Sequence, residues 1–321
     1  MNSTRHDKTS VACILSFLLI WNAVLRADPP ATQRSDTQTI QTPADLPGVL
    51  AFWDFQEPSG TPKVSKGRHQ YVLEEMNGPI QRIEDGVFGP YCADLEWGQW
   101  FRGKREEVPG LNLHGDRQEV SMVAWVKLES GRHWQYIAGI WSEGDKKFLG
   151  EARGTGNRYP ARQYALFTDG RSQTDYTTYK RVPVSRRAMG YLSPFGGATP
   201  QHPYAFDYAT GGTTLTLNQW HMIAFTYDKE WIKVYVDGVM DKNGNYNPFR
   251  YEGPIFDGGP DGADFTVALR NHPDWPNYPE RKPSGTEGFD GRIGGLAVFD
   301  RALTPEEIHS LYQAVRKEEK R

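Results

Sequence analysis

Apolar and polar residues alternate with a period of two along most of this chain, in short runs separated by Gly, Pro, Asp and Asn. Residues 120–128 show the alternation most clearly, because every second residue is apolar. The apolar members of this run are Val120, Met122, Ala124, Val126 and Leu128. Successive side chains of a β-strand point to opposite faces of the sheet, so the run predicts a strand with one buried face. Repeated runs of this kind predict an all-β protein.

A hairpin is predicted where two alternating runs follow each other closely. Residues 220–227 and 231–236 are each predicted to form a strand, and three polar residues at 228–230 form the loop between them. Asp237 and Gly238 then make a second tight turn, because Gly tolerates the positive φ that such a turn needs. Further strands are predicted at residues 49–55, 136–141, 164–168, 265–270 and 291–299.

A helix is predicted near the C-terminus. The Thr304 hydroxyl can accept a hydrogen bond from a free backbone amide, Pro305 fits a first helical turn, and the Glu307 side chain can reach back to the cap. The helix is expected from residue 305 to about residue 315, with a charged tail at residues 316–321.

The first residues predict an export signal. Arg5 and Lys8 precede an apolar run at residues 11–25, and Ala27 offers a small residue for cleavage. The run is shorter than the roughly 20 residues that a membrane-spanning helix needs. We therefore expect a signal peptide at residues 1–27 and no membrane span in the mature chain. The expected location is extracellular, at the cell surface or periplasmic.

The rest of the chain predicts a short tether and one domain. Residues 28–44 contain Ile40 as their one large apolar side chain, so we expect a disordered tether there and a domain at residues 45–315. Ten Trp, 16 Tyr and 15 Phe supply a large core. Cys92 loses its possible partner Cys13 with the signal, so no disulfide is expected. The net charge of −3 gives no basic surface for nucleic acid.

Four segments, taken in order, resemble the laminin G-like jelly-roll domains of bacterial secreted proteins, which belong to the concanavalin A-like lectin/glucanase superfamily. They are GVLAFWDFQEPSG at 48–60, VSMVAWVKLES at 120–130, NQWHMIAFTYDKEWIKVYVDGVMD at 218–241 and FDGRIGGLAVFDRALTPEEI at 289–308. The resemblance extends over residues 46–312. It implies an all-β, two-sheet antiparallel jelly-roll sandwich with a short C-terminal helix. Lectins, adhesion modules, enzymes and spacers share this fold, so function must be argued from sites.

The resemblance also implies a structural calcium ion in many members. Calcium binds six to eight oxygens, and Asp54 and Asp290 are the predicted ligands here. The family often has an acidic residue in the closing strand, where this sequence has Gly294 and Gly295, and this difference argues against a calcium site. Three more aspartates lie in a Gly-rich segment where turn formation is the favoured interpretation: Asp257, Asp261 and Asp264.

Catalysis is not predicted. Enzymes of this fold that cleave glycans with paired acids alternate three carboxylates on one strand. Glu143 and Asp145 begin such a pattern without completing it, as do Asp94 and Glu96, and we interpret them as a surface turn and a strand edge. Residues 219–221, Gln-Trp-His, match a lyase motif only superficially because the middle residue differs. The eight histidines lack the paired spacing of a zinc site.

Two aromatic segments are candidates for ligand binding. Residues 169–212 are long for a connection in a sandwich, and residues 271–285 place rings among prolines. Aromatic faces suit the apolar side of a sugar ring, and Arg donates hydrogen bonds to acidic groups. The predicted ligand-binding residues are Trp134, Tyr136, Trp141, Tyr176, Tyr179, Tyr191, Trp275, Tyr278 and Arg181. Packing is the alternative for each single ring, and it is the assignment for Trp125, Trp220 and Trp231.

These observations favour a secreted, non-catalytic recognition module that binds carbohydrate, either polysaccharide or glycoprotein, through its aromatic loops or the concave sheet. Calcium is the one cofactor considered. Two alternatives stay open. One is a glycan-cleaving enzyme, glycosidase or polysaccharide lyase, on the same fold. The other is a protein-binding or structural adhesion module that contacts other surface proteins.

Overall fold

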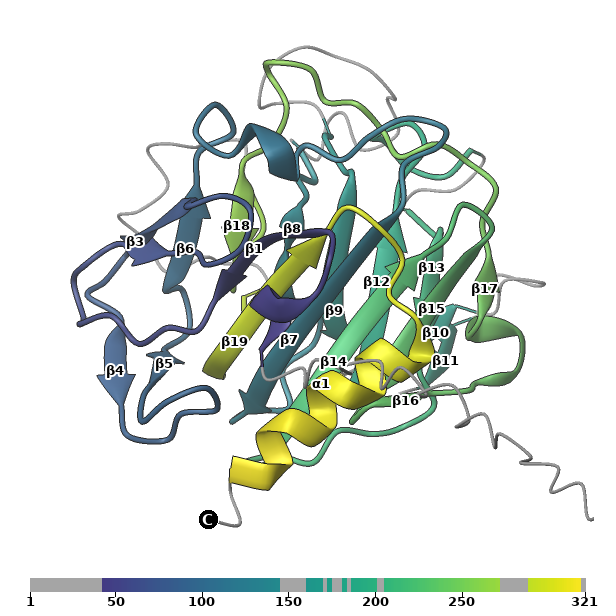
Figure 1. Ribbon diagram of the computed structural model, residues 1–321. Coiled ribbons are helices and arrows are strands. Elements are labelled where there is room, and N and C mark those ends of the chain that lie inside the picture. Colours follow the sequence, from purple (N-terminus) through teal and green to yellow (C-terminus); the bar gives the residue numbers. More distant parts are fainter. Residues whose placement is uncertain are drawn as a thin grey trace, which may run out of the picture. The chain divides into compact units, whose positions relative to one another are not determined.

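Two antiparallel β-sheets stack against each other in the computed structural model (Figure 1). The structure describes residues 42–144, 160–169, 172–174, 181–183, 186–200, 205–271 and 288–318. These residues belong to one compact unit, Ile40–Arg321. The all-β jelly-roll sandwich predicted from the sequence is confirmed.

The first sheet has nine strands in the order β16-β15-β14-β7-β19-β5-β4, with β1 paired to β19 and β17 paired to β15. The strands are β1 (Val49–Trp53), β4 (Gln81–Ile83), β5 (Cys92–Leu95), β7 (Val120–Leu128), β14 (Trp220–Tyr227), β15 (Trp231–Val236), β16 (Val239–Met240), β17 (Phe249–Arg250) and β19 (Gly291–Phe299).

The second sheet has eight strands in the order β13-β12-β9-β8-β18-β6-β3-β2. The strands are β2 (Lys63–Val64), β3 (Val72–Met76), β6 (Trp100–Gly103), β8 (Gln135–Ile140), β9 (Tyr164–Asp169), β12 (Arg187–Leu192), β13 (Tyr208–Thr210) and β18 (Phe265–Val267). A separate hairpin pairs β10 (Ser172–Thr174) with β11 (Arg181–Pro183). Short 3-10 helices lie at Pro43–Asp45, Pro109–Leu111 and Gly244–Tyr246.

The main core lies between the two sheets, and β7 shows how the sequence builds it. Met122, Ala124 and Val126 point into this core, while Val123 and Trp125 join a second apolar cluster on the outer face of the nine-stranded sheet. The alternation predicted for residues 120–128 is therefore confirmed, including its two ends.

The predicted hairpins also form. β14 pairs with β15, and both Asp237 and Gly238 have positive φ, +50° and +81°, as a tight turn of this kind requires. Two predicted strands are shorter than expected. β1 ends at Trp53, two residues early, and β18 ends at Val267, because Ala268 turns the backbone into the left-handed region with φ +71°.

Helix α1 (Pro305–Glu318) lies against the outer face of the nine-stranded sheet (Figure 1). The Thr304 amide donates to Glu307 Oε2 at 2.9 Å, and the Glu307 amide donates to Thr304 Oγ1 at 3.2 Å. This is the reciprocal cap that the sequence predicts, and the helix runs three residues beyond the expected end. Ile308 and Leu311 pack onto the sheet through the second apolar cluster. In the part of the chain that the structure describes, no helix is long and apolar enough to cross a membrane.

Candidate functional site

Aromatic side chains from four strands meet on the outer face of the eight-stranded sheet. We call this set the ring cluster: Tyr136, Trp141, Phe167, Tyr191 and Tyr208. Strand register brings the rings together, since Tyr191 pairs with Tyr208 across β12 and β13, and Phe167 pairs with Tyr136 across β9 and β8. Trp141 follows β8 directly. Three of the predicted ligand residues, Tyr136, Trp141 and Tyr191, are therefore neighbours.

The rings contact one another edge to face for the most part. Ring centroids lie 5.0 Å apart for Tyr136 and Phe167, 5.1 Å for Phe167 and Tyr191, and 5.3 Å for Trp141 and Tyr191. Tyr191 and Tyr208 are stacked at 4.4 Å. Each such pair contributes about 0.5–1.5 kcal/mol beyond the area it buries, so the cluster stiffens this face of the sheet.

Access to the ring cluster is restricted, because its members are at most 4% exposed. Two half-buried rings, Trp134 and Phe206, pack against it and keep part of their surface accessible. Trp134 comes immediately before β8 with φ +53°, whereas Trp141 comes immediately after that strand. Six strand residues separate them, which is a span of roughly 20 Å.

A buried ion pair joins the ring cluster next to Trp141. Glu143 Oε1 accepts hydrogen bonds from Trp141 Nε1 at 2.7 Å and from Arg162 Nε at 3.1 Å, and Arg162 Nη2 donates to Oε2. Arg162 is completely buried, and its Nη1 has no hydrogen-bond partner within the described structure. Burial raises the pKa of Glu143, but the attraction and hydrogen bonds of Arg162 outweigh it, and the net pKa is well below the usual value.

Glu143 is therefore held ionised, as an acceptor of hydrogen bonds rather than as a proton donor. The sequence interpretation of Glu143 as a surface turn is not what the structure shows, because Arg162, 19 positions later in the chain, pairs with the carboxylate. Spacing along the sequence could not reveal this partner. The Trp-x-Glu order of residues 141–143 was the one local signal for it.

Other predicted ligand residues cannot be placed on this face. Tyr176, Tyr179, Trp275 and Tyr278 lie outside the described residues. Arg181 belongs to β11, and its side chain also lies outside the description. Their role in binding stays a prediction.

Each of the two aspartates predicted to bind calcium contacts a cation of the protein itself. Asp54 is buried and accepts a hydrogen bond from Lys66, and Asp290 lies 3.4 Å from Arg132 Nε. Asp264, from the Gly-rich segment, bonds Arg102 Nε at 2.7 Å. No group of three His, Cys, Asp or Glu in the described ranges could hold a metal ion. Calcium binding stays a prediction.

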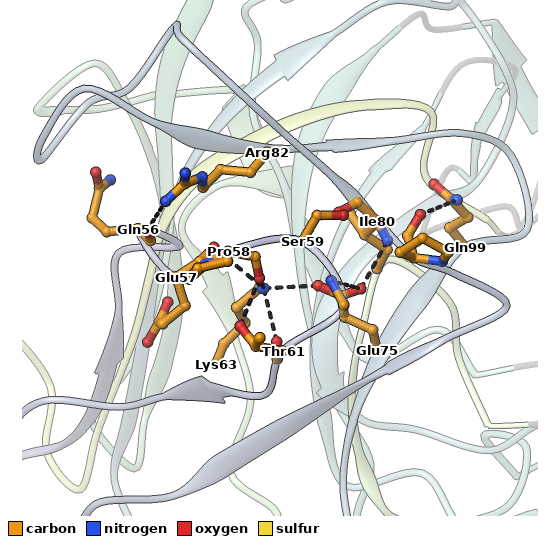
Figure 2. Close-up of polar contacts among 12 residues, drawn as sticks. Gln56, Glu57, Pro58, Ser59, Thr61, Lys63, Glu75, Ile80, Arg82 and Gln99 are labelled. Atoms are coloured by element: carbon orange, nitrogen blue, oxygen red, sulfur yellow. Dashed lines mark hydrogen bonds and ion pairs between the residues drawn. The ribbon is translucent and has the colours of Figure 1, made fainter.

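Lysine supplies the positive charge in one oxygen-rich cage of the protein (Figure 2). The Lys63 ammonium donates to the carbonyl oxygens of Pro58 at 2.8 Å and Thr61 at 2.9 Å, and to Glu75 Oε1 at 2.7 Å. Glu75 Oε2 accepts the amides of Gly60 and Ile80 at 3.0 and 2.8 Å. Carbonyl and carboxylate oxygens are the ligands of a hard cation, and here Lys63 satisfies them, with 3% of its side chain exposed.

Comparison with known proteins supports the fold. Residues 194–309 match a family model described as the concanavalin A-like lectin/glucanases superfamily. No curated protein sequence matches significantly. Among solved structures, domain 4 of AbnA, a GH43 extracellular arabinanase from Geobacillus stearothermophilus in complex with arabinotriose, is similar with a TM-score of 0.50 and 16% identity. The match covers 83% of this chain and 98% of that domain.

A mutant Trypanosoma rangeli sialidase displaying trans-sialidase activity has a TM-score of 0.48 and 14% identity, and the match covers 84% of this chain. This chain spans only 33% of the sialidase. Strand order, the C-terminal helix and the family match agree. Residues 194–309 therefore match the concanavalin A-like lectin/glucanases superfamily, and the described chain folds as a two-sheet jelly-roll sandwich.

Proposed function

We propose that this protein is an exported, non-catalytic module that binds a polysaccharide across the outer face of its eight-stranded sheet. The observation that carries the proposal is the ring cluster with accessible rings around it and the Glu143–Arg162 pair beside it. The complex of the similar arabinanase domain with arabinotriose supports a sugar ligand. Export rests on the signal predicted at residues 1–27.

The chemistry of this face suits sugars. Trp134 and Phe206 offer partly exposed ring surface for the C–H side of a sugar, and the buried rings beneath keep that surface rigid. The Glu143 carboxylate accepts hydrogen bonds from hydroxyls, and Arg162 keeps it ionised. Trp134 and Phe206 provide two accessible rings rather than one, so a polymer fits better than a monosaccharide.

The carboxyl groups argue for binding rather than cleavage. A glycosidase needs a general acid whose pKa is raised towards neutrality. Among the described residues, every carboxyl group with a clearly shifted pKa has it lowered, and in each case hydrogen bonds or nearby cations overcome burial. These groups are Asp85, Glu119, Glu143, Asp228, Asp257 and Glu307.

Affinity electrophoresis of the exported chain tests the proposal. Gels would contain neutral, acidic or sulfated polysaccharides, each run with calcium and with a chelator. We expect retardation in at least one gel. Trp134→Ala should lower the affinity derived from that retardation at least tenfold, if the stacked ring contributes about 1.4 kcal/mol or more. Trp231→Ala is the matched control, because Trp231 is also half-buried but lies on the nine-stranded sheet.

Three results would contradict the proposal. Absence of retardation in every gel would favour the protein-binding alternative. Release of reducing ends or unsaturated sugars would favour the enzyme. Equal loss in Trp134→Ala and Trp231→Ala would place binding elsewhere.

A further inference from the structure

A second candidate site lies on the opposite side of the sandwich, where α1 meets the start of β14. A pocket of about 560 Å³ opens there, and we call it the helix pocket. Its volume falls within the roughly 300–1,000 Å³ of small-molecule sites. The lining residues used below are Trp125, Asn218, Gln219, Trp220, Tyr312 and Arg316.

Two half-buried rings from separate elements line the helix pocket. Trp220 begins β14, and Tyr312 lies in α1. The indole of Trp220 is held in place, since its Nε1 donates to Asp85 Oδ1 at 3.3 Å and Lys127 Nζ lies 5.2 Å from the ring. A third ring, Trp125, is 2% exposed, and its Nε1 has no hydrogen-bond partner in the described chain.

Two amide side chains complete the lining. Asn218 and Gln219 are both exposed, and neither side chain makes a hydrogen bond within the described residues. The Asn218 backbone amide donates to Leu128 O at 2.8 Å, which anchors the segment to the end of β7. An amide both donates and accepts hydrogen bonds, as the hydroxyl groups of a sugar require.

Arg316 is the one Lys, Arg, Asp or Glu side chain among the residues that line the helix pocket. Nearby, Asp85 is neutralised by Lys127 and by Arg292 Nη1, the latter at 2.6 Å. Both ring nitrogens of His221 already have hydrogen-bond partners. Nδ1 lies 2.9 Å from Asp237 Oδ2, and Nε2 accepts a hydrogen bond from the Thr216 amide at 3.1 Å. Arg316, by contrast, lies 5.6 Å from the Tyr312 ring and forms no ion pair among the described residues.

We propose that the helix pocket binds one acidic sugar unit, a uronate or a sulfated sugar. The sugar ring lies against Trp220 and Tyr312, its hydroxyls bond the amides of Asn218 and Gln219, and its anionic group pairs with Arg316. One cation without an ion-pair partner can neutralise a ligand with one negative charge, whereas a nucleotide polyphosphate would need several cations. The site is separate from the ring cluster, so it stands whether or not the proposed polysaccharide face is correct.

Isothermal titration calorimetry of the exported chain tests this site. The probes are digalacturonic acid and, as its uncharged match with the same linkage and configuration, α-1,4-galactobiose. We expect the acid to bind at least tenfold more tightly than the neutral sugar, because a hydrogen bond to a charged group contributes more than a neutral one. Thermal unfolding verifies that each variant is folded.

Variants separate the helix pocket from the rest of the surface. Arg316→Gln should lower the affinity for the acidic sugar about tenfold and leave the affinity for the neutral sugar unchanged. Trp220→Ala should lower the affinity for both sugars. Arg250→Gln is the control, since Arg250 is exposed on the same sheet but does not line the pocket. Trp134→Ala should have no effect, which separates this site from the polysaccharide face.

Two outcomes would overturn the assignment. One is that neither sugar binds, or that both bind equally well. The other is that the acidic sugar binds but Arg316→Gln and Trp220→Ala leave its affinity unchanged.

Discussion

The two sheets treat their charged side chains differently. On the eight-stranded side, Lys63 and Glu75 form a buried ion pair at 3% and 6% exposure, and Arg162 is completely buried while its partner Glu143 keeps 20% of its side chain exposed. On the nine-stranded side, Asp85 meets Lys127 and Arg292, and all three side chains keep 14–28% of their surface exposed. Removing one partner of a buried pair leaves an uncompensated charge out of water, whereas solvent screens an accessible pair. The eight-stranded side therefore depends on its charges for stability more than the other side does.

The aromatic side chains show a contrast between packed and partly exposed rings on each sheet. The ring cluster is packed ring on ring, whereas Trp220 and Tyr312 on the other sheet keep part of their surface free beside the helix pocket. Closely packed rings contribute to stability, while half-buried rings leave room for a ligand. This contrast can be tested with matched substitutions on the two sheets.

The largest expected difference is between two arginines. Arg162→Met should lower the free energy of unfolding by about 3–5 kcal/mol, because it removes the buried partner of Glu143 and leaves a carboxylate that is only 20% exposed without its cation. Arg292→Met, on the other sheet, should cost at most about 1 kcal/mol, since its partners remain in reach of water. Urea denaturation of both variants measures this. Equal losses would contradict the division between the sheets.

Two tryptophans provide the next comparison. Trp141→Ala removes a ring that is 2% exposed and should cost about 3–5 kcal/mol, including the cavity it leaves. Trp220→Ala removes a half-buried ring at the pocket edge and should cost clearly less. Denaturant midpoints of the two variants, measured at the same pH and salt, give the difference. A larger loss for Trp220→Ala would show that this ring is part of the core.

The pH dependence of stability isolates the Glu143 carboxylate. Its pKa is lowered on folding from an ordinary value near 4.5 to about 2, so its contribution is present above pH 4.5 and is lost as the pH falls towards 2. The loss is on the order of 3 kcal/mol. Unfolding measured between pH 2 and pH 6 should show this loss in the natural protein. Glu143→Gln should remove most of this dependence of the unfolding free energy on pH. Glu252→Gln is the control, because Glu252 is exposed.

The sequence predicted the parts of the fold that depend on local patterns. The alternation in residues 120–128 and 291–299 gave both strands with their ends, and Thr304 with Glu307 gave the helix cap. Asp237 and Gly238 gave the turn, because only neighbouring residues decide it. These features need no knowledge of distant partners.

The sites depend on contacts between distant segments, and these were harder to predict. Tyr136, Trp141 and Tyr191 were chosen as single rings, and only the register of β8, β9 and β12 makes them neighbours. Trp220 alternates within its strand and was assigned to packing, but helix α1 leaves part of it open to the helix pocket. The position of a helix across a sheet is set by tertiary packing, which no local pattern contains.

The smallest expected effect concerns the cap of α1 and connects stability with the helix pocket. Thr304→Ala removes the hydroxyl that accepts the Glu307 amide and should cost about 1 kcal/mol. Tyr312 and Arg316 line the pocket from this helix. Loosening the first turn of the helix should therefore also lower the affinity for the acidic sugar, but by less than Arg316→Gln does. Glu306→Gln, at an exposed first-turn position without a capping bond, is the control. A loss of stability without any change in sugar affinity would mean that the helix places its pocket residues independently of its cap.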